Sequence, residues 1–160
     1  PRHRSREGRE GDDSLDEHST RLLSFLRKES EGADPDEEPW RWRLRMAEAV
    51  AASLEEEAFG LRALYVFGSA KNATCGPGSD IDLLVHFSGG ERQREDLTLW
   101  LDGWSRSLAE MNYLRTGYRS DGLLDVHVVT DEDIAAKSSY AAKIDAVTDA
   151  ARPLTLGGAS

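Results

Sequence analysis

The chain has 160 residues, 39% hydrophobic and 31% charged, which is the length and composition of one folded domain with a single core. No apolar run approaches the roughly 20 residues that a membrane-spanning helix requires. The formal net charge of -10 argues against extended nucleic acid as a partner, because such binding needs many Lys and Arg. The single cysteine, Cys75, excludes an intrachain disulfide and fits a reducing cytoplasm.

The N-terminal quarter of the chain has a different character from the rest. Residues 1–13 lack apolar periodicity and are predicted to be disordered. Residues 14–39 are predicted to form an accessory helix, with Ser14 as its N-cap, followed by an acidic linker rich in Pro and Gly. Because the first residue is Pro1 rather than methionine, we expect a processed chain or a domain of a longer polypeptide.

Residues 40–153 are predicted to form the main domain. The order helix, strand, strand, helix, strand indicates an α/β (α+β) fold with a small mixed β-sheet and helices mainly on one face. A helical apolar stripe runs from Pro39 to about Phe59, and a second runs from Glu91 to about Tyr113. Three runs rich in β-branched and aromatic residues are predicted strands: Ala63 to Phe67, Ile81 to Phe87 and Leu123 to Val129.

The C-terminal part is predicted to be helical and then irregular. Thr130 is the expected N-cap of a helix that continues into the alanine-rich residues 141–151, with Asp133 in the capping position three residues later. Pro153 and the pair Gly157 and Gly158 are expected to end regular structure, which leaves residues 154–160 as a flexible tail.

The residues most informative about chemistry are two acids at the start of the second strand. Asp80 and Asp82 occupy alternate positions, so their side chains project from one face with Cα atoms roughly 7 Å apart. Gly68 and Ser69 end the preceding strand, where a backbone without a Cβ can approach a phosphate closely. Mg²⁺ is typically held by one or two carboxylates together with substrate phosphates, so the pattern predicts a metal-nucleotide site.

A third carboxylate, Asp125, stands in the apolar third strand. Burying a carboxylate is costly unless it is paired or coordinates a metal, so Asp125 is the candidate to complete a two-metal site. Two interpretations without a metal remain open: Asp80 and Asp82 cap the preceding turn, and Asp125 is an acid on a solvent-exposed strand position. His86 and His127 share the faces of these acids, but lie about 13 Å and 7 Å along the strands from them, so neither is predicted to bind metal.

The combination of Gly68-Ser69 with Ser79-Asp80-Ile81-Asp82 resembles the polymerase beta-like nucleotidyltransferase superfamily, and is similar in form to its small minimal domains in bacteria and archaea. The resemblance implies that fold and two Mg²⁺ ions, with Mn²⁺ as an alternative. It implies the following roles: Asp80, Asp82 and Asp125 as metal-binding and catalytic residues, and Gly68, Ser69, Lys71 and Ser79 as nucleotide-binding residues.

The implied reaction is transfer of a nucleoside monophosphate (NMP) from a nucleoside triphosphate (NTP) to a hydroxyl acceptor, with release of pyrophosphate. Two alternatives stay open: a non-catalytic nucleotide-binding module of a larger protein, and an antitoxin-like enzyme that modifies a protein partner. The phrase from Leu64 to Thr74 also resembles domains attached to phosphoenolpyruvate-using, dikinase-like proteins. The loop from Lys71 to Thr74 lacks the Arg and Gly common in minimal domains, which leaves the base and the acceptor open.

Overall fold

A computed structural model of the chain describes residues 12–32, 34, 36–72, 74–138, 140–144 and 151–157. The chain divides into two units, Pro1–Asp34 and Pro35–Ser160. The first unit contains helix α1 (Asp12–Glu31), in the region where the sequence predicts a helix. It begins before Ser14, which therefore lies inside the helix instead of capping it; residues 1–11 lie outside the described residues. None of the described helices combines the length and apolar character needed to cross a bilayer.

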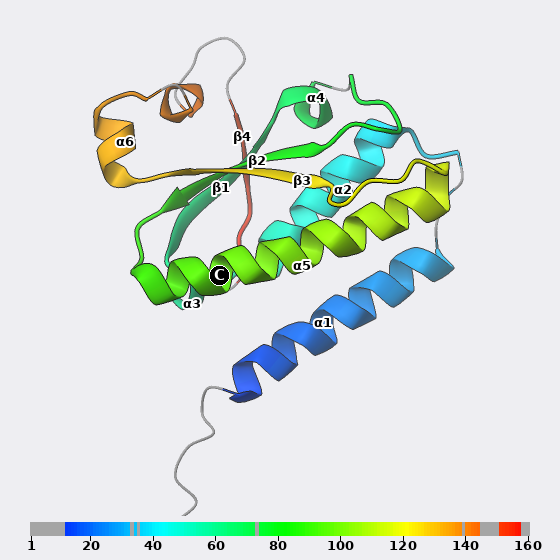
Figure 1. Ribbon diagram of the computed structural model, residues 1–160, viewed down its shortest axis with the longest axis horizontal. Helices are drawn as coiled ribbons and strands as arrows, with labels where there is room; N and C mark the ends of the chain where they lie inside the picture. The colour runs from blue at the N-terminus through cyan, green and yellow to red at the C-terminus, as the bar shows by residue number, and fades with distance from the viewer. Residues whose placement is uncertain are drawn as a thin grey trace, which may run out of the picture. The chain divides into compact units, whose positions relative to one another are not determined.

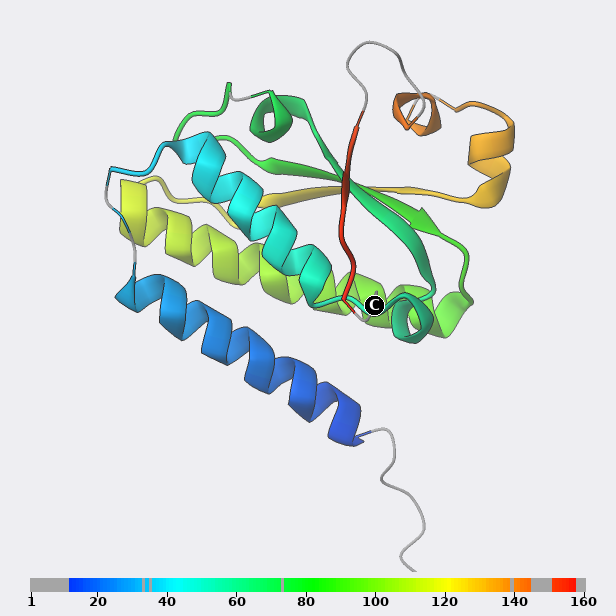
Figure 2. The ribbon, with the colours of Figure 1, turned by 180° about the vertical axis from the view of Figure 1, so that it is seen from behind.

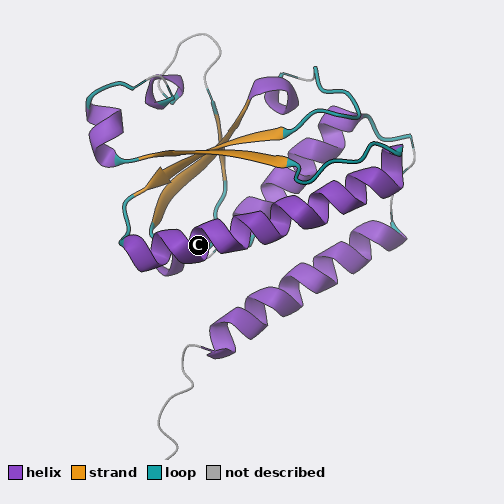
Figure 3. Ribbon diagram, in the orientation of Figure 1, coloured by secondary structure: helices purple, strands orange, loops and turns teal. Residues whose placement is uncertain are grey.

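The second unit is built on a four-stranded sheet with the order β3-β2-β1-β4 (Figure 3). Strands β1 (Leu61–Phe67) and β2 (Ile81–Phe87) are antiparallel, β2 and β3 (Leu124–Val129) are parallel, and β4 (Arg152–Leu154) pairs antiparallel with β1. The sheet is therefore mixed, and the three strands predicted from the sequence are confirmed.

Two long helices lie on one side of the sheet, as both ribbon views show (Figures 1 and 2). Helix α2 (Pro39–Ala52) packs on β1 and β2, and helix α5 (Glu91–Thr116) packs on β3. Because parallel strands require a crossover connection, α5 links β2 to β3. The side chains that fill this layer are buried aromatic and aliphatic residues spaced three or four apart: Trp42, Met46 and Val50 on α2, and Leu97, Leu101, Trp104 and Leu108 on α5.

The helix predicted from Pro39 to about Phe59 is in fact two helices. Helix α2 ends at Ala52, and a short helix α3 (Glu56–Phe59) follows. Ser53 ends α2 because its Oγ donates a hydrogen bond to the Val50 carbonyl oxygen at 2.7 Å, an alternative to helical continuation. Glu55 then forms an isolated β-bridge with Gly157, a partner that the local sequence does not reveal.

The C-terminal prediction is half right. Thr130 caps helix α6 (Asp131–Ala135) in a capping box with Asp133, as expected. The long helical tail is wrong: α6 ends at Ala135, a 3-10 turn η1 (Ala141–Lys143) follows, and Arg152–Leu154 form β4. Residues 145–150 of the predicted tail lie outside the described residues.

The expectation of a flexible tail is also wrong for residues 154–157. Leu154 pairs with Leu64 of β1, and Leu156 is buried with 6% of its surface exposed. The Gly157 amide donates to the Ala51 carbonyl oxygen at 3.1 Å, which ties this segment to the end of α2. The segment is therefore part of the folded unit.

The opposite face of the sheet carries a smaller core. Phe67, Leu84, Val129, Ala141 and Ala151 form a buried cluster, against which Ile134 of α6 packs. Because strand side chains alternate, the face that carries Leu84 also carries Asp82. The predicted arrangement, with helices mainly on one face and the acids on the other, is confirmed.

Candidate active site

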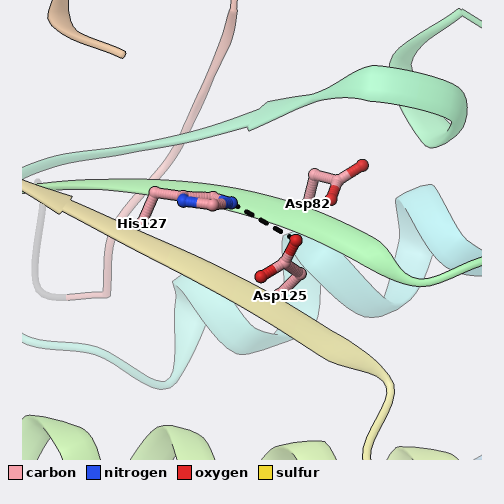
Figure 4. A group of neighbouring side chains, drawn as sticks. All are labelled: Asp82, Asp125 and His127. Atoms are coloured by element: carbon pink, nitrogen blue, oxygen red, sulfur yellow. Dashed lines mark ion pairs between the residues drawn. The ribbon is translucent and has the colours of Figure 1, made fainter. Parts of the chain in front are cut away.

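Three neighbouring strands place Phe67, Asp82 and Asp125 in one row. Phe67 of β1 is opposite Asp82 of β2, and Asp82 is opposite Asp125 of β3. Side chains directly opposite on one face lie close enough to interact. Figure 4 shows both side chains projecting from the same side of the two strands. The pairing of Asp82 with Asp125 follows from the parallel register of β2 and β3.

The carboxyl groups of Asp82 and Asp80 are both costly to ionise in the folded protein. The pKa of Asp82 is raised to about 6, first by burial and then by the charge of Asp125, a hydrogen bond with Asp125 and the charge of Asp80, against a smaller lowering by His127. The pKa of Asp80 is also raised, first by burial and then by Asp125, against an opposing effect of Arg43. Several oxygen donors with crowded negative charge are the donor set that a divalent cation neutralises, so these residues fit a metal site.

Asp82→Asn is expected to stabilise the metal-free protein at alkaline pH. Since the folded-state pKa of Asp82 lies above its ordinary value, its contribution to stability is full below about pH 4 and is lost as pH rises through about 6. After allowance for solvent screening, the gain at pH 8 is about 1 kcal/mol, or roughly 3 °C in melting temperature. Melting scans in EDTA at pH 4 and pH 8 test this; an equal difference between variant and wild type at both pH values contradicts it.

Gly68 leaves room for the Asp82 carboxylate. Gly68 has φ +69°, a left-handed conformation that side chains rarely adopt, and it begins the one-turn helix α4 (Gly68–Lys71). A Cβ placed on Gly68 would overlap the Asp82 carboxylate, with Oδ2 as its nearest atom. The sequence indicated a glycine for close approach of a phosphate; the structure adds a second reason, which is space for Asp82.

Gly68→Ala is expected to lower the activity of this site by about 100-fold, because the new methyl group must displace Asp82 or strain the backbone. The matched control is Gly103→Ala on α5, where an added Cβ meets no atom within 4 Å and alanine favours the helix. Rates and melting temperatures of both variants test this. Equal activity of the two variants would show that the space at Gly68 is unimportant.

The loop before β2 is held by a buried arginine that sequence reasoning missed. Arg43 of α2 is completely buried, and burial lowers its pKa. Its guanidinium donates to the carbonyl oxygens of Ser79 at 2.8 Å and Pro77 at 3.0 Å, and to Oδ1 of Asn112 at 3.1 Å. Asn112 in turn donates from Nδ2 to the Pro77 carbonyl oxygen at 2.9 Å. These contacts fix the backbone that leads into Asp80.

Ser79 closes the turn within this loop. Its Oγ accepts a hydrogen bond from the Gly76 amide at 3.0 Å, so at least part of its role is local. Ser69 and Lys71 lie in α4, directly after Gly68. Their contacts with a nucleotide, like that of Ser79, stay predictions.

The start of β3 is positioned by Ser105 of α5. Its Oγ accepts hydrogen bonds from the amides of Leu123 at 3.1 Å and Leu124 at 3.0 Å. A Cβ on Gly122 would approach the Ser105 Oγ to 2.6 Å, so the glycine permits this close contact. Asp125 is the next residue along the chain after Leu124. Helix α5 therefore sets the position at which the strand that carries Asp125 begins.

His127 lies beside the acids. Its Nε2 is 3.3 Å from Oδ2 of Asp125, and ligand atoms of Asp82, Asp125 and His127 all lie within 4.8 Å of one another (Figure 4). The sequence-based prediction that His127 does not bind metal used only the distance between the backbone positions of His127 and Asp125. The side chains of these two residues converge above the strand. Asp80 is not one of these three residues, and its role as a metal ligand stays a prediction.

His86, the histidine of β2, lies in a different environment from His127. Nε2 of His86 lies 2.6 Å from Oδ1 of Asp131 at the start of α6. Asp131 also lines a pocket of about 490 Å³ formed mainly by the 87–91 and 130–132 segments and Arg94. This pocket is at the end of β2 and β3 away from Asp82 and Asp125, so its size gives no information about the acid cluster.

Comparisons with known proteins identify a family for the chain. None of the curated proteins matches the chain. A solved structure from Sulfolobus solfataricus, provisionally assigned as a nucleotidyltransferase, has 22% sequence identity and a TM-score of 0.32, over 83% of this chain and 87% of that one. The family model described as the nucleotidyltransferase domain matches residues 51–147, which include Gly68, Asp82 and Asp125. With more than half of its residues matched, the chain belongs to the nucleotidyltransferase domain family, a family of transferases.

Proposed function

We propose that this protein is a divalent-metal-dependent nucleotidyltransferase that transfers an NMP from an NTP to a hydroxyl acceptor and releases pyrophosphate. The observation that carries the proposal is the pairing of Asp82 with Asp125 across adjacent strands, next to the backbone of Gly68. Family membership supports transfer in general. The raised pKa of Asp82, caused by burial and by Asp125, supports a site that gains from a bound cation.

In the proposed mechanism, Asp82 and Asp125 would hold the metal, and Asp80, at the end of the loop that Arg43 fixes, would supply a further carboxylate ligand. A bound divalent ion supplies neutralisation of charge on the transferring phosphate. The triphosphate is assigned to Gly68, Ser69 and Lys71 of α4 and to Ser79 of the turn before β2, because the backbone of Gly68 lies beside the Asp82 carboxylate that would hold the metal.

The acceptor hydroxyl is assigned to the side of Asp125. Its carboxylate accepts the hydroxyl proton as the new O–P bond forms to the α-phosphate, and the α–β phosphoanhydride bond breaks to release pyrophosphate. Asp125 is more exposed than Asp82, so an acceptor can reach it from solvent. The lone cysteine supports a reducing, cytoplasmic location for this reaction.

Calorimetry combined with a label-transfer assay distinguishes an enzyme from a nucleotide-binding module. Each of the four NTPs is titrated into the protein with Mg²⁺ or Mn²⁺, and product formation is followed separately with α-labelled NTP and a cell lysate as the source of acceptors. The proposal expects metal-dependent NTP binding together with a labelled acceptor. Binding without label transfer in any lysate tested favours the non-catalytic module, and absence of metal-dependent binding contradicts both.

A further inference from the structure

His127 has the position of a third ligand in the cluster with Asp82 and Asp125. Two donor atoms bound at right angles to one ion, each about 2.1 Å from it, lie about 3 Å apart. Nε2 of His127 and Oδ2 of Asp125 are already 3.3 Å apart, and a ligand atom of Asp82 lies within 4.8 Å of both. Small side-chain rotations would therefore bring all three onto one ion.

The imidazole is held in this orientation by aromatic neighbours. The His127 ring is stacked on Tyr140, with 4.1 Å between centroids and an interplanar angle of 21°. Phe67, directly before Gly68, contacts the same ring at 5.6 Å in a tilted arrangement. Figure 4 shows the ring lying along the strands with one nitrogen directed toward Asp125. Such fixation lowers the entropic cost of binding an ion through this nitrogen.

The mixed donor set determines which ions suit the site. Mg²⁺ prefers oxygen ligands and near-ideal octahedral geometry, whereas imidazole suits divalent transition ions. We infer that His127 is a protein ligand of the metal, together with Asp82 and Asp125, and that it makes the site prefer a divalent transition ion such as Mn²⁺ over Mg²⁺. The inference rests on the proposed function for the presence of a metal and goes beyond it in naming a ligand and an ion preference.

Pulsed EPR of Mn²⁺ bound to the full chain without nucleotide tests the ligand directly. The expected result is nuclear modulation from a coordinated imidazole ¹⁴N in the wild type, lost in His127→Phe, which keeps an aromatic ring to stack on Tyr140. His86→Gln is the matched control, because His86 lies on the neighbouring strand but contacts Asp131 instead of the acids. Its modulation is expected to equal that of the wild type.

Titrations of Mn²⁺ and of Mg²⁺ test the preference. The dissociation constant of Mg²⁺ divided by that of Mn²⁺ is expected to exceed one in the wild type. This ratio is expected to fall by about tenfold or more in His127→Phe. The wild-type spectrum decides the ligand question even where the variant folds poorly. Mn²⁺ that binds and is lost in Asp82→Asn, yet shows no ¹⁴N coupling, overturns the inference and leaves the proposed function standing. Absence of any metal binding, with or without NTP, overturns both.

Discussion

Replacing Asp82 with Asn is expected to lower the rate of NMP transfer by about 10³-fold or more, with little loss of stability. The amide keeps the shape of the side chain but removes the negative charge that we propose binds the metal. Asp82 is the residue that faces Asp125 across the sheet. Initial rates with saturating NTP measure the effect, and melting scans confirm that the variant is folded.

The matched control for this substitution is Asp102→Asn. Asp102 is exposed on α5 and pairs only with the neighbouring Arg106 at 3.0 Å among the contacts described, so its neutralisation is expected to change the rate by less than about twofold. A rate within tenfold of the wild type for Asp82→Asn would rule out Asp82 as a metal ligand essential to turnover. Equal losses in both variants would point to a general effect of net charge.

Replacing Arg43 with Met is expected to destabilise the protein by about 3 kcal/mol. Methionine retains apolar volume but leaves the carbonyl oxygens of Pro77 and Ser79 without their charged donor, and Asn112 without one of its partners. Because Arg43 and Asn112 are both fully buried, water does not readily replace the hydrogen bond between them. Denaturant unfolding at neutral pH measures the change.

Arg45→Met on the same helix is the control for Arg43→Met. Arg45 forms a bidentate pair with Glu37 at 2.7 Å, but its side chain is 42% exposed, so the expected cost is below about 1 kcal/mol. Arg43→Met should also reduce activity beyond its effect on folding, because the freed loop carries Asp80. Similar stabilities for the two variants would contradict the assigned role of Arg43.

Features with a local signal were predicted well. The alternation of β2 placed Asp82 on one face, and the capping pair of Thr130 and Asp133 identified the start of α6. The combination of Gly68 with Asp82 was visible because both residues lie at strand ends separated by one loop. Such signals depend on neighbours in sequence, which is why they could be interpreted without coordinates.

Features that depend on distant partners were missed. Arg43 is 36 residues from Ser79 and 69 from Asn112, and nothing near it in sequence indicates that it would be buried. Pro153 was interpreted as the end of regular structure, yet it pairs with Tyr65 in β4, an edge strand, where a residue without an N–H is tolerated. Pairing with a distant strand therefore extended regular structure past the point where the local sequence predicted its end.

The position of His127 required a different kind of information. The sequence gives its distance from Asp125 along the strand, but the orientation of its ring depends on Tyr140, which lies beyond α6. Burial and neighbouring charge likewise determine the pKa of Asp82. The residue types at the site were therefore predictable, whereas the side-chain arrangement was not.

The most direct test of the central claim is a parallel reaction with α-labelled and γ-labelled NTP, purified protein, a divalent ion and the acceptor found in lysate. Nucleotidyl transfer predicts that the α-label becomes covalently attached to the acceptor and the γ-label is recovered only in pyrophosphate, with both lost in Asp82→Asn. Recovery of the γ-label on the acceptor, or as orthophosphate with no α-label transferred, would contradict the account.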